Sequence, residues 1–121
     1  MVAKDKEGKE ITFSLGYKVW LEKDDVVQGD GFFQILKLIE QSGSIAGAAY
    51  AMRMSYRAVW GKIKTVEKTW GVSLVITKVG GREGGGAYLT PEAFQLLDDY
   101  HLFREQVDKE INRIFKQVFS V

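Results

Sequence analysis

The chain has 121 residues, of which 45% are apolar and 27% charged, and its formal net charge is +1. No apolar run approaches the roughly 20 residues of a membrane-spanning helix, and the N-terminus lacks the apolar stretch of a secretory signal, so we expect one soluble, cytoplasmic domain with no membrane partner. The sequence contains no cysteine, which excludes disulfides and thiolate metal sites.

The N-terminal third predicts β-structure followed by a helix. Residues 17–28 alternate apolar and polar side chains around a polar break at residues 23–25, which is typical of a β-hairpin. Apolar side chains at residues 11, 13 and 15 indicate that the tail of residues 1–15 is either irregular or an additional strand. Asp30 precedes an amphipathic run over residues 32–42, so we expect it to cap a helix that ends near Gly43.

Two further helices follow, each introduced by a serine. Ser44 precedes the alanine-rich residues 45–52, whose small side chains allow another helix to cross closely. Ser55 precedes residues 56–70, and Gly71 offers an end to this third helix. Its apolar side chains recur at helical spacing and are Val59, Ile63, Val66 and Trp70.

A glycine-rich segment joins two runs of strand-like composition. Residues 72–79 and 87–90 are the two runs, and five of the seven residues from Gly80 to Gly86 are glycine. Two strands directly after a helix–turn–helix form a wing, with the glycine segment as its tip. We therefore predict an α+β fold: a winged helix–turn–helix over residues 16–90, with an N-terminal β-hairpin and a long C-terminal dimerisation helix.

Residues 91–121 contain no helix breaker after Pro91 and predict one long helix. Its apolar residues alternate spacings of four and three over four heptads, which is more than a domain of this size needs to cover its own core. We expect part of this stripe to pack on a second copy of the chain, with Arg104 extending to the edge, pairing with an acid across the interface, or setting the register. The predicted interface consists of Leu97, Tyr100, Arg104, Val107, Ile111, Ile114 and Val118.

The segments SGSIAGAAYAMRMSYRAVWGKIKTVEKTWGVSLV and GGREGGGAYLT resemble the N-terminal DNA-binding domain of ModE-type molybdate-responsive transcriptional regulators, and more distantly the helix–turn–helix of LysR-type regulators. The resemblance covers about residues 15–119. It implies a homodimer that binds specific sites on double-stranded DNA through its third helix. Full-length ModE-type regulators carry further molybdate-binding domains; we expect this chain to act without them, with any effector or sensor in a separate subunit.

The charge pattern also favours a DNA-binding third helix. Residues 53–82 carry seven basic side chains and one acidic, whereas the segments on either side are net acidic. The first turns of a recognition helix meet base edges, and Arg57 is well suited because a guanidinium can bond both O6 and N7 of guanine. The predicted contacts are Ser55, Tyr56, Arg57, Trp60 and Gly61 on bases, Lys62, Lys64 and Lys68 on phosphates, and Lys78 and Arg82 in the wing.

Two alternatives belong to other functional classes. In a protein-interaction module without DNA binding, the basic face and the glycine tip would be solvated surface, and Tyr56 and Trp60 would pack against the first helix. A direct oxyanion sensor would bind molybdate or a similar anion at Arg82 or at a helix N-terminus. The single histidine, His101, and the lack of a paired nucleophile and base favour no enzyme activity, no metal site and no cofactor.

Overall fold

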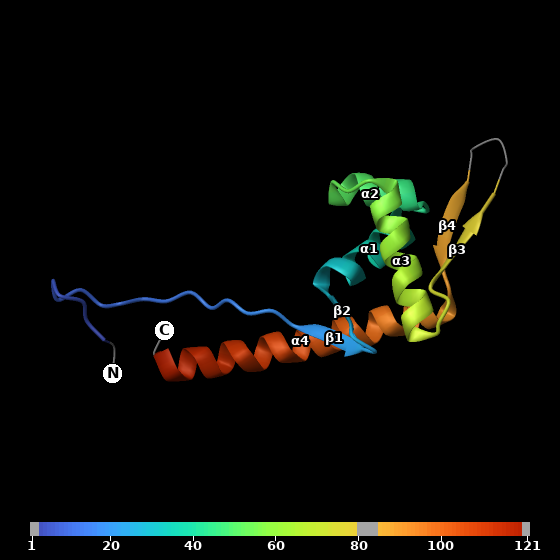
Figure 1. The fold of residues 1–121 in the computed structure, drawn as a ribbon. Helices are drawn as coiled ribbons and strands as arrows, with labels where there is room; N and C mark the ends of the chain where they lie inside the picture. The colour runs from blue at the N-terminus through green and yellow to red at the C-terminus, as the bar shows by residue number, and fades with distance from the viewer. Residues whose placement is uncertain (1–2, 80–84, 120–121) are drawn as a thin grey trace. The chain divides into compact units, whose positions relative to one another are not determined.

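The computed structural model describes residues 3–79 and 85–119 (Figure 1). Its elements are, in chain order, β1 (Trp20–Lys23), β2 (Val26–Gly29), α1 (Asp30–Ser42), α2 (Ile45–Met52), α3 (Tyr56–Trp70), β3 (Val75–Lys78), β4 (Gly86–Leu89) and α4 (Pro91–Phe119). They form two compact units, one of Val19–Tyr100 and one of the described parts of Met1–Lys18 and His101–Val121. The predicted winged helix–turn–helix with an N-terminal hairpin and a long C-terminal helix is confirmed.

The serines expected to begin α2 and α3 do so. The Ser44 side chain accepts a hydrogen bond from the backbone N–H of Gly47 at 2.8 Å, and the Ser55 side chain accepts one from Ala58 at 3.0 Å. Each serine thereby satisfies one of the N–H groups that a first helical turn leaves without an intrahelical partner. The starts of α2 and α3 are therefore fixed by local chemistry.

Asp30 does not cap α1, contrary to the prediction. Gly29 occupies the capping position without a side-chain hydrogen bond, and Asp30 is the first residue of the helix. The Asp30 carboxylate instead accepts a hydrogen bond from the Tyr100 hydroxyl. A tertiary contact across 70 residues of sequence has therefore replaced the local one.

Helix ends and turns require left-handed backbone at a few positions. Gly43 and Gly71 end α1 and α3 with φ of 75° and 70°, as their sequence positions predicted. Arg53 takes the same conformation between α2 and α3, with φ of 56°, although it is not glycine. The left-handed conformation is sterically unfavourable for residues that have a Cβ atom, so the backbone at Arg53 is strained.

The first hairpin is shorter than its sequence pattern predicted. β1 begins at Trp20 rather than Tyr17, and it pairs with β2 in an antiparallel register that places Trp20 opposite Gly29. Asp24 and Asp25 form the two-residue turn, with φ of 51° and 65°. Positive φ at both positions is typical of a type I′ turn, whose twist matches that of the two strands.

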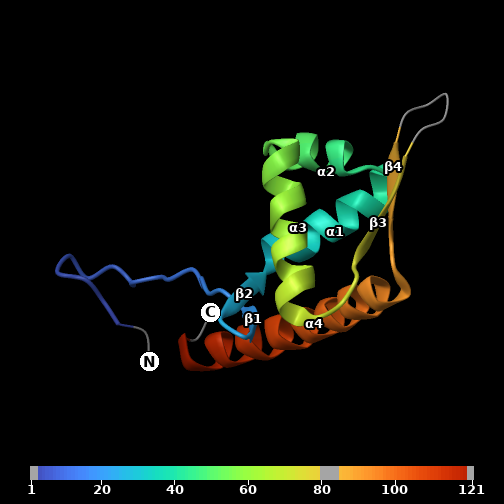
Figure 2. The same ribbon diagram turned by 45° about the vertical axis from the view of Figure 1, so that its right-hand side comes forward.

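The apolar core of Val19–Tyr100 is built from all three helices of the helix–turn–helix, the wing and the beginning of α4. Figures 1 and 2 show α2 lying across the N-terminal end of α3, which the small side chains Ala48 and Ala49 allow, since both are buried. Phe33 of α1 stacks on Tyr100 of α4 with ring centroids 4.0 Å apart. The first ten residues of α4 therefore belong to the same unit as α3.

In the other unit, the N-terminal segment contacts the later turns of α4. The Tyr17 hydroxyl donates to the Asp108 carboxylate, and this hydrogen bond is the main reason that the pKa of Tyr17 is raised. Arg104 pairs with Asp108 at 2.8 Å and lies 5.1 Å from the centre of the Tyr17 ring. Phe13 packs edge-on against Phe119. No strand forms over residues 11–15, so that alternative is wrong.

None of the helices within the described ranges is long and apolar enough to span a membrane.

Candidate nucleic-acid interface

Helix α3 separates an apolar face from a basic face. Val59, Ile63 and Val66 are buried in the core, as the four-and-three spacing predicted. The side chains of the opposite side, Arg57, Lys64 and Lys68, are exposed, and so is Lys62, which lies one turn from the buried Val59 and Val66 and therefore borders the apolar face. The basic face of α3 is the surface formed by Arg57, Lys64 and Lys68 together with Gly61. The positive charges of α3 therefore face solvent, on a helix whose N-terminus is capped by Ser55.

Two aromatic side chains extend this surface at the start of α3. Tyr56 is 52% exposed and Trp60 is 43% exposed, so packing within the chain leaves about half of each side chain accessible. They lie one helical turn apart and therefore share a side of the helix. Apolar side chains in such positions can contact thymine methyl groups in a major groove. The Ser55 hydroxyl oxygen, in contrast, already accepts a hydrogen bond from the backbone N–H of Ala58.

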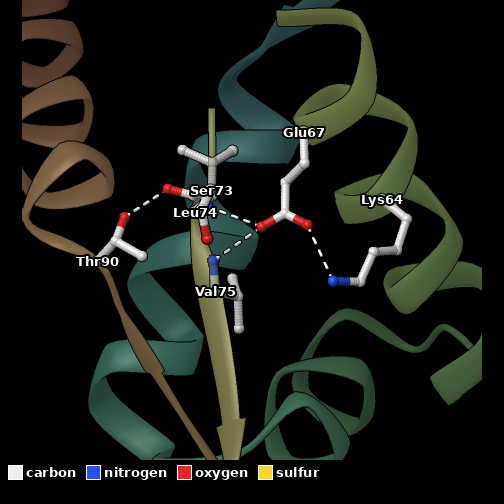
Figure 3. A network of polar contacts seen from close by, with 6 residues as sticks. All are labelled: Lys64, Glu67, Ser73, Leu74, Val75 and Thr90. Carbon is white, nitrogen blue, oxygen red and sulfur yellow. Dashed lines mark hydrogen bonds and ion pairs between the residues drawn. The ribbon is translucent and has the colours of Figure 1, made fainter. Parts of the chain in front are cut away.

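The acidic residue within the basic segment joins α3 to the wing (Figure 3). One carboxylate oxygen of Glu67 accepts hydrogen bonds from the backbone N–H groups of Leu74 at 2.7 Å and Val75 at 3.1 Å. The other oxygen accepts from Lys64 Nζ at 3.0 Å. Sequence reasoning missed this role, since no pattern links a glutamate within a helix to a strand that begins eight residues later.

These contacts explain the acidity of Glu67. Partial burial acts to raise the pKa of its carboxyl group, but the hydrogen bonds from Leu74, Lys64 and Val75 together outweigh it and hold the pKa below its usual value. Lys64 also lies 5.8 Å from the centre of the Trp60 ring. The Lys64 ammonium therefore lies near both a carboxylate and an aromatic ring, while the Lys64 side chain is 46% exposed.

The wing is an antiparallel hairpin anchored at both ends. Val75 pairs with Leu89 at its base and Lys78 with Gly86 toward its tip. Thr90 closes the base, because its hydroxyl donates to the Ser73 carbonyl at 2.6 Å and accepts from an N–H of the first turn of α4. The wing is therefore fixed to α4 as well as to α3.

Toward its tip, the wing is hydrogen-bonded to the residue that ends α1. The backbone N–H of Ala87 donates to the carbonyl of Gly43 at 2.8 Å. The Lys78 ammonium lies 5.3 Å from the centre of the Tyr88 ring on the paired strand. Arg82, the other predicted wing contact, lies outside the described residues. Of the two wing cations proposed from sequence, Lys78 is thus the one that can be placed.

A hollow of about 420 Å³ lies between the wing, the start of α2 and the first turns of α3. Its lining includes Ser44, Tyr56, Trp60, Lys78 and Gly86. Ile45 and Ala46 of the first turn of α2 also line it, and the N–H groups of a first helical turn carry a partial positive charge that suits anions. Residues proposed from sequence for base contact and for wing contact are thus brought to one place.

The residues predicted for a dimer interface divide into two sets. Leu97 and Tyr100 are already buried in the core of Val19–Tyr100, each only 4% exposed, so their surface is used within the chain. Arg104 forms an ion pair with Asp108 of the same helix, and its role at a dimer interface stays a prediction. Ile114 and Val118 are exposed, while Val107 and Ile111 are half-buried.

Within residues 3–79 and 85–119, no group of three or more histidine, cysteine or carboxylate side chains could hold a metal ion.

Comparison with known proteins identifies the same region. The family model described as "Bacterial regulatory helix-turn-helix protein, lysR family" matches residues 32–93, which is just over half of the chain. The molybdenum transport protein ModE of Azotobacter vinelandii is 30% identical over 92 residues, or 76% of this chain and 34% of that protein. The transcriptional regulator ModE of Haemophilus influenzae is 38% identical over 69 residues, or 57% of this chain and 27% of that protein. The chain thus spans about a third or less of these relatives.

Solved structures share the fold. The crystal structure of the CbnR_DBD-DNA complex matches with a TM-score of 0.56 and 20% identity, over 72% of this chain and 94% of that chain. The BenM_DBD/benA site 1 DNA complex matches with a TM-score of 0.54 and 16% identity, over 72% of this chain and 92% of that chain. At this level of identity the likeness establishes the winged helix–turn–helix architecture.

Proposed function

The chain belongs to the lysR family of bacterial regulatory helix-turn-helix proteins, resembling the N-terminal region of ModE regulators, and on this premise we propose that it is a transcriptional regulator that binds a specific sequence of duplex DNA. The observation that carries the proposal is the exposed basic face of α3 beside the wing. A duplex is a polyanion whose major groove admits one helix, and this surface offers one cationic helix edge.

The first turns of α3 would read the bases. Arg57 is exposed in the first turn and can donate two parallel hydrogen bonds to a guanine edge. Tyr56 and Trp60 would meet apolar base edges, and Ser55 lies at the same end of the helix. Lys62 and Lys68 would contact phosphates, which positions the helix without reading sequence. Lys64 would reach a phosphate only by leaving Glu67.

The wing would grip the backbone beside the groove. Lys78 lines the hollow near the start of α2, where helical N–H groups also face an incoming phosphate. The expected contact of Arg82 with a minor groove or phosphate remains part of this proposal on sequence grounds. In this arrangement the glycine-rich tip allows close approach to the sugar–phosphate chain.

We also propose that two copies associate through the later turns of α4. Apolar side chains at Val107, Ile111, Ile114 and Val118 continue a heptad spacing, and the last two are 47% and 62% exposed. A two-fold dimer would place two recognition helices on half-sites about one helical turn apart, or a multiple of that. The operator would then be an inverted repeat.

Selection of bound fragments from a random duplex pool tests the function. We expect enrichment of one sequence, and we expect Arg57→Ala to relax the preference at one position, worth about 1–3 kcal/mol of discrimination. Lys62→Ala should weaken binding to all sequences and lower the salt slope by about one unit. Lys109→Ala removes an exposed lysine of α4 and serves as the charge-matched control, with no loss of sequence preference.

If the chain showed no detectable binding to any duplex at low salt, the proposal of DNA binding would be contradicted. If the chain still self-associated, that outcome would favour the protein-interaction alternative. If Arg57→Ala kept the full preference of the unmodified chain, DNA binding would stand but the assignment of base reading to Arg57 would be wrong.

A further inference from the structure

Gly61 lies in the second turn of α3, in the interior of a 15-residue helix. Apart from proline, glycine is the poorest helix former, so an interior glycine normally has a structural reason. The reason is commonly a positive φ or a neighbour that leaves no room for a side chain. Gly61 has neither, because its φ is not positive and a Cβ built on its backbone would meet no heavy atom within 4 Å.

Other glycines of the same unit do show such reasons. A Cβ at Gly29 would lie 2.7 Å from the carbonyl oxygen of Val19, and one at Gly47 would lie 2.6 Å from the Ser42 hydroxyl. Gly43 has a positive φ, which ends α1. Gly61 shares its lack of such a reason with Gly31, but Gly31 lies in the first turn of α1 whereas Gly61 lies in the interior of its helix.

The surroundings of Gly61 indicate what approaches it. It belongs to the basic face of α3, with Arg57 one turn before it and Lys64 and Lys68 following at helical spacing. Trp60, next to it in sequence, is half-exposed. The missing side chain therefore leaves a gap in a cationic surface, and such a gap is complementary to an anionic partner that touches the helix backbone.

We propose that duplex DNA comes into van der Waals contact with the α3 backbone at Gly61, so that this residue sets how deeply the recognition helix enters the major groove. The inference rests on the proposed DNA-binding function and adds a steric determinant to it. Because residue 61 has no side chain, the helix backbone can come closer to the DNA, by about the width of a methyl group, than it could with alanine there. The contact at Gly61 would thereby set how close Arg57 comes to the base edges.

The inference predicts two effects of opposite sign for Gly61→Ala. The free protein should melt about 4 °C higher, because alanine favours the helix and has open space around it. Affinity for the selected duplex should fall about tenfold, because an added methyl group overpacks a filled contact. A change that only perturbed the fold would lower both quantities together.

Gly31→Ala provides the matched control. Gly31 is also helical and free of neighbours within 4 Å of a built Cβ, but it is exposed rather than half-buried and lies in the first turn of α1. The experiment measures melting temperature, affinity for the selected duplex and sedimentation of the free protein for the unmodified chain and both variants. We expect Gly31→Ala to leave affinity unchanged, within about twofold, as surface changes away from an interface do.

Equal affinities of Gly61→Ala and Gly31→Ala for the duplex would overturn the inference while leaving the proposed function intact, provided the unmodified chain binds. A Gly61→Ala variant that changes self-association but keeps its affinity for DNA would overturn it in favour of a second copy of the chain. Failure of the unmodified chain to bind any duplex would instead remove the proposed function, and the inference with it.

Discussion

Replacing Glu67 with alanine removes the carboxylate that joins α3 to the start of β3. Two backbone N–H groups, at 2.7 and 3.1 Å, and the Lys64 ammonium, at 3.0 Å, lose their acceptor. The Glu67 side chain is only 12% exposed, so water replaces these contacts poorly. Hydrogen bonds to a charged acceptor contribute about 1.5–3 kcal/mol, whereas a half-exposed ion pair such as Lys64–Glu67 contributes less than about 1 kcal/mol. We expect Glu67→Ala to lower the free energy of unfolding by about 2–4 kcal/mol.

Chemical denaturation at neutral pH measures this loss, with Glu67→Gln as a more conservative change. The amide oxygen can still accept from the backbone of Leu74 and Val75, but it lacks the charge, so we expect a loss of about 1 kcal/mol. Glu40→Ala, which removes an exposed carboxylate from α1, is the control and should stay within about 0.5 kcal/mol of the unmodified chain.

The pH dependence gives an independent check. Because the pKa of Glu67 is lower in the folded state, its ionised form stabilises the fold above the unfolded pKa of about 4.3, and this contribution is lost as pH falls through the folded pKa. The stability difference between the unmodified chain and Glu67→Gln should therefore narrow on acidification. A difference that stays constant with pH, or a Glu67→Ala loss as small as that of Glu40→Ala, would refute the reasoning.

Three further changes test local features by thermal or chemical denaturation. Ser55→Ala removes the cap that accepts from Ala58 and should cost about 1 kcal/mol; an unchanged stability would mean that water caps α3 equally well. Arg53→Gly should stabilise the protein by about 0.5–1 kcal/mol, because glycine adopts the left-handed turn without steric cost, and a destabilised variant would contradict that account. Thr90→Val leaves the Ser73 carbonyl without its side-chain donor and should cost about 1–2 kcal/mol, whereas a neutral change would show that the wing base needs no such anchor.

Features governed by neighbouring residues were predictable from sequence. Ser44 and Ser55 cap their helices and Gly43 and Gly71 end theirs, because each effect depends on a few adjacent backbone groups. The apolar spacing in α3 identified its buried face for the same reason. The exposed basic face followed directly from that assignment.

Features governed by distant contacts were not predictable in this way. Asp30 has the composition of a cap, yet its carboxylate bonds to Tyr100. Glu67 lies in a basic segment, and only folding brings it to the N–H groups of Leu74 and Val75. Heptad spacing marked Leu97 as apolar and buried, but the pattern does not distinguish burial within the chain from burial against a second copy.

The most direct test of the central claim is to map the backbone amides whose nuclear magnetic resonance signals move when an isotopically labelled chain is titrated with the selected duplex. We predict that the largest changes fall on the first turns of α3, the start of α2 and the strands of the wing, with Arg57, Trp60 and Lys78 among them. Changes confined to residues 101–119, or no changes at duplex concentrations that saturate a specific site, would contradict the account.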